Sequence, residues 1–167
     1  MAAVLWSSTA STLMRRLCVG HRHLPGGHFL PCAPTPPLPY PAAHFDVIYC
    51  LSVFTHLDER MQDAWLAELD RILEPGGVLL LTVYSEAATG VLGADGQEML
   101  RDFGFVHKRS SKLRGLLPDW YQTTFHSREY MVRRLSQWFS GIQYFAVPGG
   151  EQNVVTARKV PAGVLLL

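Results

Sequence analysis

Hydrophobic and polar positions define a strand–helix–strand unit over residues 45–84. Residues 45–53 form a nearly continuous apolar run, which is typical of a strand buried on both faces. From residue 61 the apolar positions take helical spacing, with Asp58 as the expected N-cap. Pro75, Gly76 and Gly77 should end this helix, and residues 78–84 return to a buried-strand pattern. The pattern predicts a βαβ unit in a parallel α/β sheet.

After residue 84 the pattern is less regular. It predicts a helix near residues 97–103 that Gly104 ends, an irregular insertion over residues 105–125, and a helix from Ser127 to about residue 138. Residues 142–147 and 153–158 have the pattern of strands. The connection between them is too short for a parallel crossover, so we expect an antiparallel hairpin.

Charge and composition exclude several classes of protein. The formal net charge of +1 gives no electrostatic case for binding nucleic acid or a membrane surface. No apolar run reaches the roughly 18 residues that a membrane span needs. The three cysteines have no metal-ligand spacing, which favours a reducing compartment, and we expect a cytoplasmic protein with no bound metal.

Residues 1–44 differ from the rest of the chain, because they contain no acidic residue and seven of the eleven prolines. Three interpretations stay open: a mitochondrial targeting segment, the remnant of a larger domain, or a leader without native structure. We therefore divide the chain into an irregular leader or remnant (1–35), a partial domain (36–160) and a short apolar tail (161–167).

Two stretches of the sequence resemble a known family. FDVIYCLSVFTHL (45–57) and ELDRILEPGGVLLLTV (68–83) resemble the fourth strand, the following helix and the fifth strand of class I S-adenosylmethionine-dependent methyltransferases of the type 11-like group. PPLPYPAAHFD (36–46) and LPDWYQTTFHSREY (117–130) extend the resemblance over about residues 36–159. It implies a Rossmann-like, mostly parallel sheet with a C-terminal antiparallel hairpin, N-terminally truncated to the C-terminal half of the domain.

The resemblance also implies S-adenosylmethionine as the cofactor. Ligands of open α/β sheets bind beyond the carboxyl ends of the strands. By resemblance, Ser52 and Val53 would flank the methionine end of the cofactor, and Cys32 and Ala33 would approach its adenine.

The resemblance also implies a methyl acceptor, which the sequence does not identify. His56 is the candidate catalytic base because its unperturbed pKa lies near neutrality, or else it only positions its loop. Trp120, Tyr121 and His126 could line the acceptor site or belong to the core.

Two features of the family have no counterpart before Asp46: the Gly-rich turn after the first strand and the acidic residue that holds the ribose. Two functions therefore stay open, an impaired methyl transfer and a non-catalytic fragment or pseudoenzyme that binds a partner. No GxGxxG or GxSxG sequence supports a dehydrogenase or a hydrolase. We expect the chain to bind S-adenosylmethionine weakly or not at all.

Overall fold

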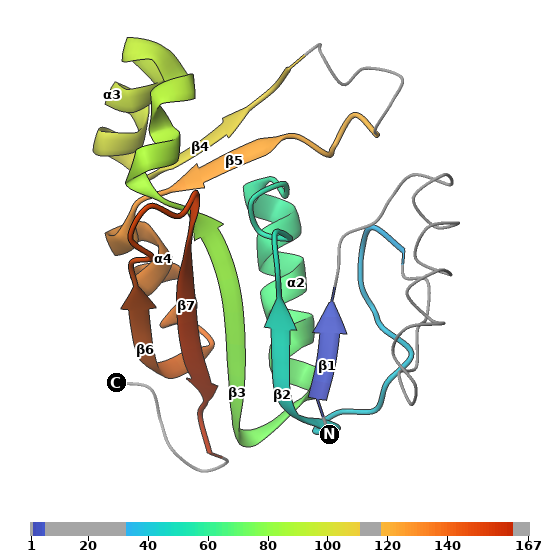
Figure 1. Ribbon diagram of the computed structural model, residues 1–167. Coiled ribbons are helices and arrows are strands. Elements are labelled where there is room, and N and C mark those ends of the chain that lie inside the picture. Colours follow the sequence, from blue (N-terminus) through green and yellow to red (C-terminus); the bar gives the residue numbers. More distant parts are fainter. Residues whose placement is uncertain (1, 6–32, 111–117, 162–167) are drawn as a thin grey trace, which may run out of the picture.

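The computed structural model describes residues 2–5, 33–110 and 118–161, which form a five-stranded main sheet of order β1-β2-β3-β7-β6 and a second sheet of two strands. β1, β2 and β3 pair in parallel, and β7 pairs antiparallel with β3 and with β6. Four strands therefore point the same way, so the mostly parallel sheet and the α/β class are confirmed (Figure 1). The elements are β1 Ala2–Leu5, β2 Phe45–Cys50, α2 Glu59–Ile72, β3 Leu73–Tyr84, the 3₁₀ helix η1 Glu86–Leu92, α3 Gly93–Phe103, β4 Phe105–Lys108, β5 Thr123–His126, α4 Arg128–Leu135, β6 Phe139–Phe145 and β7 Gln152–Lys159.

The edge strand β1 lies in the segment that we expected to be an irregular leader. Its backbone pairs in parallel with β2, with Ala2 opposite Val47 and Leu5 opposite Cys50. In doubly wound sheets of order 3-2-1-4-5-6, the first, fourth and fifth strands are neighbours, and β1, β2 and β3 have this arrangement. Four residues are too few to show a periodic pattern, which is why the sequence did not reveal this strand.

Helix α2 and the two strands it connects form the βαβ unit that the sequence predicts. The Asp58 carboxylate accepts a hydrogen bond from the Met61 N–H at 2.8 Å and caps the helix. The helix ends at Ile72 and β3 begins at once, with Gly76 in a left-handed conformation (φ 79°). Gly77 is required for packing, since a Cβ there would lie 2.8 Å from the Glu74 carbonyl oxygen and 3.0 Å from that of Asp46.

The expected irregular insertion is wrong at its two ends, because β4 and β5 pair there as the separate antiparallel sheet. Phe105 pairs with His126, and Lys108 pairs with Thr123. Each strand has four residues, too few for an alternating pattern to stand out. This small sheet lies beyond the carboxyl ends of β2 and β3 (Figure 1).

The C-terminal elements follow the prediction closely. Ser127 caps α4 by accepting the Tyr130 N–H at 3.1 Å, and β6 and β7 form the expected antiparallel hairpin. β7 also pairs with β3, from Val78 opposite Arg158 to Tyr84 opposite Gln152. The hairpin thus extends the main sheet and brings the start of β7 beside the carboxyl end of β3.

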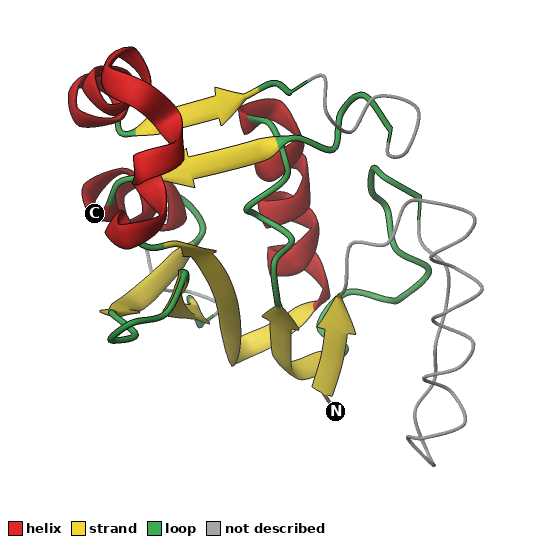
Figure 2. Ribbon diagram, turned by 45° about the horizontal axis from the view of Figure 1, so that its top comes forward, coloured by secondary structure: helices red, strands yellow, loops and turns green. Residues whose placement is uncertain are grey.

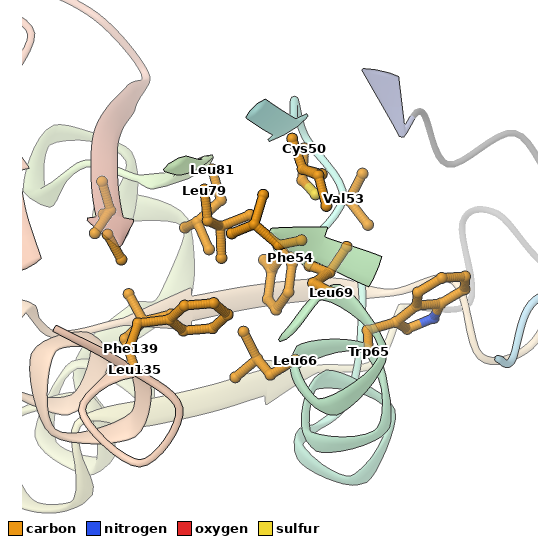
Figure 3. Packing of buried hydrophobic residues seen from close by; sticks show 14 of the residues in the cluster. Cys50, Val53, Phe54, Trp65, Leu66, Leu69, Leu79, Leu81, Leu135 and Phe139 are labelled. Carbon is orange, nitrogen blue, oxygen red and sulfur yellow. The ribbon is translucent and has the colours of Figure 1, made fainter. Parts of the chain in front are cut away.

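The main core lies between the sheet and the helices, which Figure 2 shows gathered on one side of the main sheet. Leu66 and Leu69 of α2 pack against Leu79 and Leu81 of β3, together with Phe139 (Figure 3). Val47 of β2 and Leu51, the residue after that strand, are exposed. Among the described residues there is no helix long and apolar enough to cross a membrane.

Candidate functional site

Three polar side chains form a closed cluster where β2 and β3 end. The Ser52 N–H donates to Thr82 Oγ1 at 2.9 Å, the Thr82 hydroxyl donates to Gln152 Oε1 at 2.6 Å, and Gln152 Nε2 donates to Ser52 Oγ at 2.9 Å. All three side chains are half-buried. Ser52 has φ 55°, a conformation that costs free energy in a residue other than glycine and that is enriched at functional sites.

Ser52 was predicted from the sequence as a cofactor contact. Thr82 was predicted only as the start of the neighbouring strand end, where open α/β sheets bind ligands, and Gln152 was not predicted. Gln152 belongs to β7, which pairs antiparallel with β3, and no local sequence pattern predicts that pairing. Val53 has the predicted position after β2, but its side chain is only 8% exposed and belongs to the core.

The loop after Ser52 holds a single half-exposed side chain, His56, between buried ones. Phe54, Thr55 and Leu57 are at most 2% exposed. The loop is also fixed from outside, since Thr124 N–H donates to the Thr55 carbonyl at 2.8 Å and Thr124 Oγ1 donates to the Leu57 carbonyl at 2.8 Å. Strand β5 therefore sets where His56 lies.

His56 is held in one neutral tautomer. Its Nδ1 lies 2.8 Å from the Gln122 carbonyl oxygen, which can only accept, so Nδ1 carries the hydrogen and Nε2 has a free lone pair. Burial lowers the pKa of His56, and the hydrogen bond to Gln122 offsets this in part. The imidazole is therefore neutral at pH 7, the state that a general base needs.

Of the three aromatic residues proposed for an acceptor site, Tyr121 lies beside His56, and Trp120 lies beside Tyr121. The Tyr121 ring stacks on the imidazole with centroids 4.0 Å apart and 19° between the planes, and Trp120 meets Tyr121 edge to face at 5.9 Å. Trp120 is half-buried and packs partly against the core. Burial raises the pKa of Tyr121, and so does the nearby Tyr84, which places these two phenols in one neighbourhood.

His126 is not brought together with these residues. It is 5% exposed, and its Nε2 lies 3.1 Å from Gln62 Oε1, while Gln62 Nε2 donates to the carbonyls of Phe54 and Leu57. Burial lowers the pKa of His126 to about 3. His126 thus supports the His56 loop through Gln62 and does not face an acceptor.

The two residues proposed near the adenine stay predictions. Cys32 lies outside the described residues, and Ala33 is exposed. Cys50 is buried, which raises the pKa of its thiol to about 12 and makes it unreactive. Over residues 33–110 and 118–161 no group of His, Cys, Asp and Glu side chains could hold a metal ion.

A cleft of about 490 Å³ opens at the carboxyl end of β3, and β5, which lines it through Thr123 and Phe125, also holds the His56 loop through Thr124. Its walls come from η1, from β5 and from the turn between β6 and β7. Tyr84 and Phe125 lie stacked at its base with centroids 4.9 Å apart. No motif in the sequence predicts this cleft, because its walls come from segments far apart in the chain.

Comparisons with known proteins agree with this architecture. The model of the methyltransferase domain family matches residues 10–81. This match begins before residue 36, where we expected the domain to start. A demethylmenaquinone methyltransferase of Deinococcus radiodurans is 42% identical over 57 residues, or 34% of this chain and 23% of that protein. A probable methyltransferase of Arabidopsis thaliana is 45% identical over 56 residues, or 33% of this chain and 9% of that protein. The matches thus span less than a quarter of either relative.

Solved structures show the same fold. A methyltransferase of Methanosarcina mazei matches with a TM-score of 0.59 and 18% identity, over 96% of this chain and 82% of that one. The apo form of the methyltransferase SibL matches with a TM-score of 0.60 and 15% identity, over 96% of this chain and 44% of that one. In its motifs, in the matched part of the family model and in its fold, the chain is similar to the class I S-adenosylmethionine-dependent methyltransferases. The general activity of this class is methyl transfer, and its cofactor is S-adenosylmethionine.

Proposed function

We propose that the carboxyl edge of β2 and β3 binds the methionine end of S-adenosylmethionine and supports methyl transfer to an acceptor beside His56. The observation that carries the proposal is the Ser52, Thr82 and Gln152 cluster. It offers hydrogen-bond donors and acceptors, half-exposed, at the edge where open α/β sheets bind ligands. Such a cluster fits the ammonium and carboxylate groups of a methionine.

The bound cofactor supplies a methyl group on an electrophilic sulfonium, so the residues of this chain need only align the acceptor and remove its proton. His56 Nε2 has the free lone pair for that task, and the Gln122 carbonyl keeps it oriented by holding Nδ1–H. Tyr121 covers one face of the imidazole and leaves the ring edge to meet the acceptor.

We further propose that cofactor binding is weak. Residues 1–44 hold no carboxylate that could pair with the ribose hydroxyls. A hydrogen bond to a charged group contributes about 1.5–3 kcal/mol, so its loss weakens binding by about 10- to 150-fold. The domain bounds stay part of the proposal, with a segment at 1–35 whose strand β1 joins the main sheet, the methyltransferase-like domain at 36–160 and a tail at 161–167.

The missing carboxylate favours a second candidate, a non-catalytic protein that acts by binding a partner. Without a ribose contact the chain could keep the fold and lose the cofactor. The two candidates differ in whether the polar cluster binds S-adenosylhomocysteine, the product form of the cofactor.

Calorimetric titration with S-adenosylhomocysteine tests both. We expect saturable binding weaker than micromolar, and about tenfold weaker again in Thr82→Val, because that variant removes the hydroxyl that joins Ser52 to Gln152. Thr156→Val, a half-exposed threonine in the middle of β7, is the matched control and should bind like the wild type. No binding by the wild type would favour the non-catalytic candidate, and an equal loss in both variants would refute the assigned location.

A further inference from the structure

The cleft beside Tyr84 has two walls made mainly of small residues, with Val91 as the one larger side chain that η1 contributes. Ala87, Ala88 and Gly90 of η1 line one wall, and Gly149 and Gly150 of the β6–β7 turn line another. The backbone of this turn is fixed, since the Ser85 hydroxyl donates to the Gly150 carbonyl at 2.8 Å. Small residues on both walls leave a slot between backbones, a shape that accepts a flat group more readily than a branched one.

An aromatic pair forms the base of the slot. The rings of Tyr84 and Phe125 are stacked with 26° between their planes. Phe125 is only 1% exposed, whereas Tyr84 is half-exposed, so Tyr84 is the ring that a ligand would meet. Aromatic faces bind other rings by offset stacking and attract cations through the ring quadrupole.

Glu151 brings a negative charge to the same slot. The residue lines the cleft and is exposed, while its backbone carbonyl accepts the Ser85 N–H at 2.8 Å and so fixes its position. It forms no ion pair within the described part of the chain. No lysine or arginine from that part lines the cleft itself, although Lys108 Nζ donates to the backbone carbonyl of the lining residue Val91. The charge acts at the base of the slot, because Glu151 adds to the effect of burial in raising the pKa of Tyr84.

We infer that this cleft binds a ligand that combines a planar ring with a cationic amine, the ring against Tyr84 and the amine toward Glu151. The inference rests on the proposed function in one respect: it names the chemical class of the methyl acceptor. A neutral ring would make the stacking contact alone, and an anionic ring would be repelled by the carboxylate.

The test is an NMR titration of the ¹⁵N-labelled chain, without cofactor, with tryptamine, indole-3-acetate and 1,4-diaminobutane. We expect tryptamine to shift the Gly149 and Gly150 amide signals saturably, and to bind at least about fivefold more tightly than the other two probes. Equal binding of tryptamine and indole-3-acetate, or no shift at these amides, would overturn the inference.

Two variants localise the effect. Glu151→Gln should remove the preference for tryptamine over indole-3-acetate, whereas Glu74→Gln, an exposed glutamate at the opposite end of β3, should keep it. Gly90→Leu should block tryptamine, because a Cβ at Gly90 meets no atom within 4 Å and the added side chain is free to fill the slot. Unchanged binding in Gly90→Leu, or a preference kept in Glu151→Gln, would refute the site.

The outcome is separable from that of the cofactor experiment. If tryptamine binds as expected while S-adenosylhomocysteine does not, the methyl transfer is refuted and the chemistry of the cleft stands. If S-adenosylhomocysteine binds while the cleft shows no preference for the cation, the proposed function stands and the acceptor class is refuted.

Discussion

The buried imidazole of His126 should make folding stability depend on pH. Burial lowers the pKa of His126 to about 3 in the folded chain, whereas an unfolded chain has a histidine pKa of about 6.5. Between these two values the unfolded state binds a proton that the folded state does not, so stability rises with pH in this window. The stabilisation from a neutral His126 is complete above about pH 6.5 and is lost as the pH falls toward 3.

The magnitude at pH 5 follows from the unfolded value alone. At pH 5 the solution lies about 1.5 units below the histidine pKa of the unfolded chain. Each unit corresponds to about 1.36 kcal/mol, so protonation of the unfolded chain lowers the folding stability by about 2 kcal/mol relative to pH 7.5. His56 and His107, whose pKa values burial also lowers, add to the total in the same direction. A variant at His126 is therefore needed to isolate its share.

His126→Gln is that variant, because its amide nitrogen can replace Nε2 as donor to Gln62 and does not titrate. Urea denaturation of both proteins at pH 7.5 and pH 5, followed by circular dichroism, gives the two differences. We expect the wild type to lose about 2 kcal/mol more than the variant between these pH values. Equal losses would refute the argument that His126 stays neutral in the folded core.

Three further predictions concern the βαβ unit and the base. In thermal denaturation, Gly77→Ala should destabilise the chain more than Gly76→Ala. Only Gly76 of the two has a positive φ, but a Cβ at Gly77 would meet backbone oxygens, whereas a Cβ at Gly76 would meet no atom within 4 Å. The reverse order would contradict this turn geometry. Leu66→Ala should cost about 2–5 kcal/mol in urea denaturation, since Leu66 is fully buried, and a cost below about 1 kcal/mol would show that the core is looser than this burial indicates. His56→Asn, which can keep a donor to Gln122, should lower methyl transfer by about 10²- to 10⁴-fold with any acceptor that the wild type methylates, whereas a merely positioning role would leave the rate near the wild-type value.

Elements with a long, strongly periodic pattern could be predicted from the sequence, and short ones could not. The cap at Asp58, the cap at Ser127 and the turn at Gly104 have local chemistry that the structure confirms. β1, β4 and β5 have four residues each, so their formation depends on pairing with distant partners. The insertion of β7 between β3 and β6 is likewise a matter of tertiary pairing.

Some residues of the candidate site could likewise be predicted from the sequence, and others could not. Ser52 and His56 follow a recognisable strand, so their place at the sheet edge could be predicted from position alone. Gln152 and Glu151 reach the same edge only because β7 runs antiparallel beside β3. His126 was proposed for the acceptor site from its aromatic neighbours in the sequence, but it ends β5 with its side chain in the core, where Gln62 contacts it.

The central claim is that the end of β2 and β3 is the cofactor-binding edge. The most direct measurement is a titration of the ¹⁵N-labelled chain with S-adenosylhomocysteine, followed by NMR. We predict saturable shifts of the amide signals of residues 52–57 and of Gln152, with an affinity weaker than micromolar. Signals that stay unchanged at millimolar S-adenosylhomocysteine, or shifts confined to residues away from this edge, would contradict the claim.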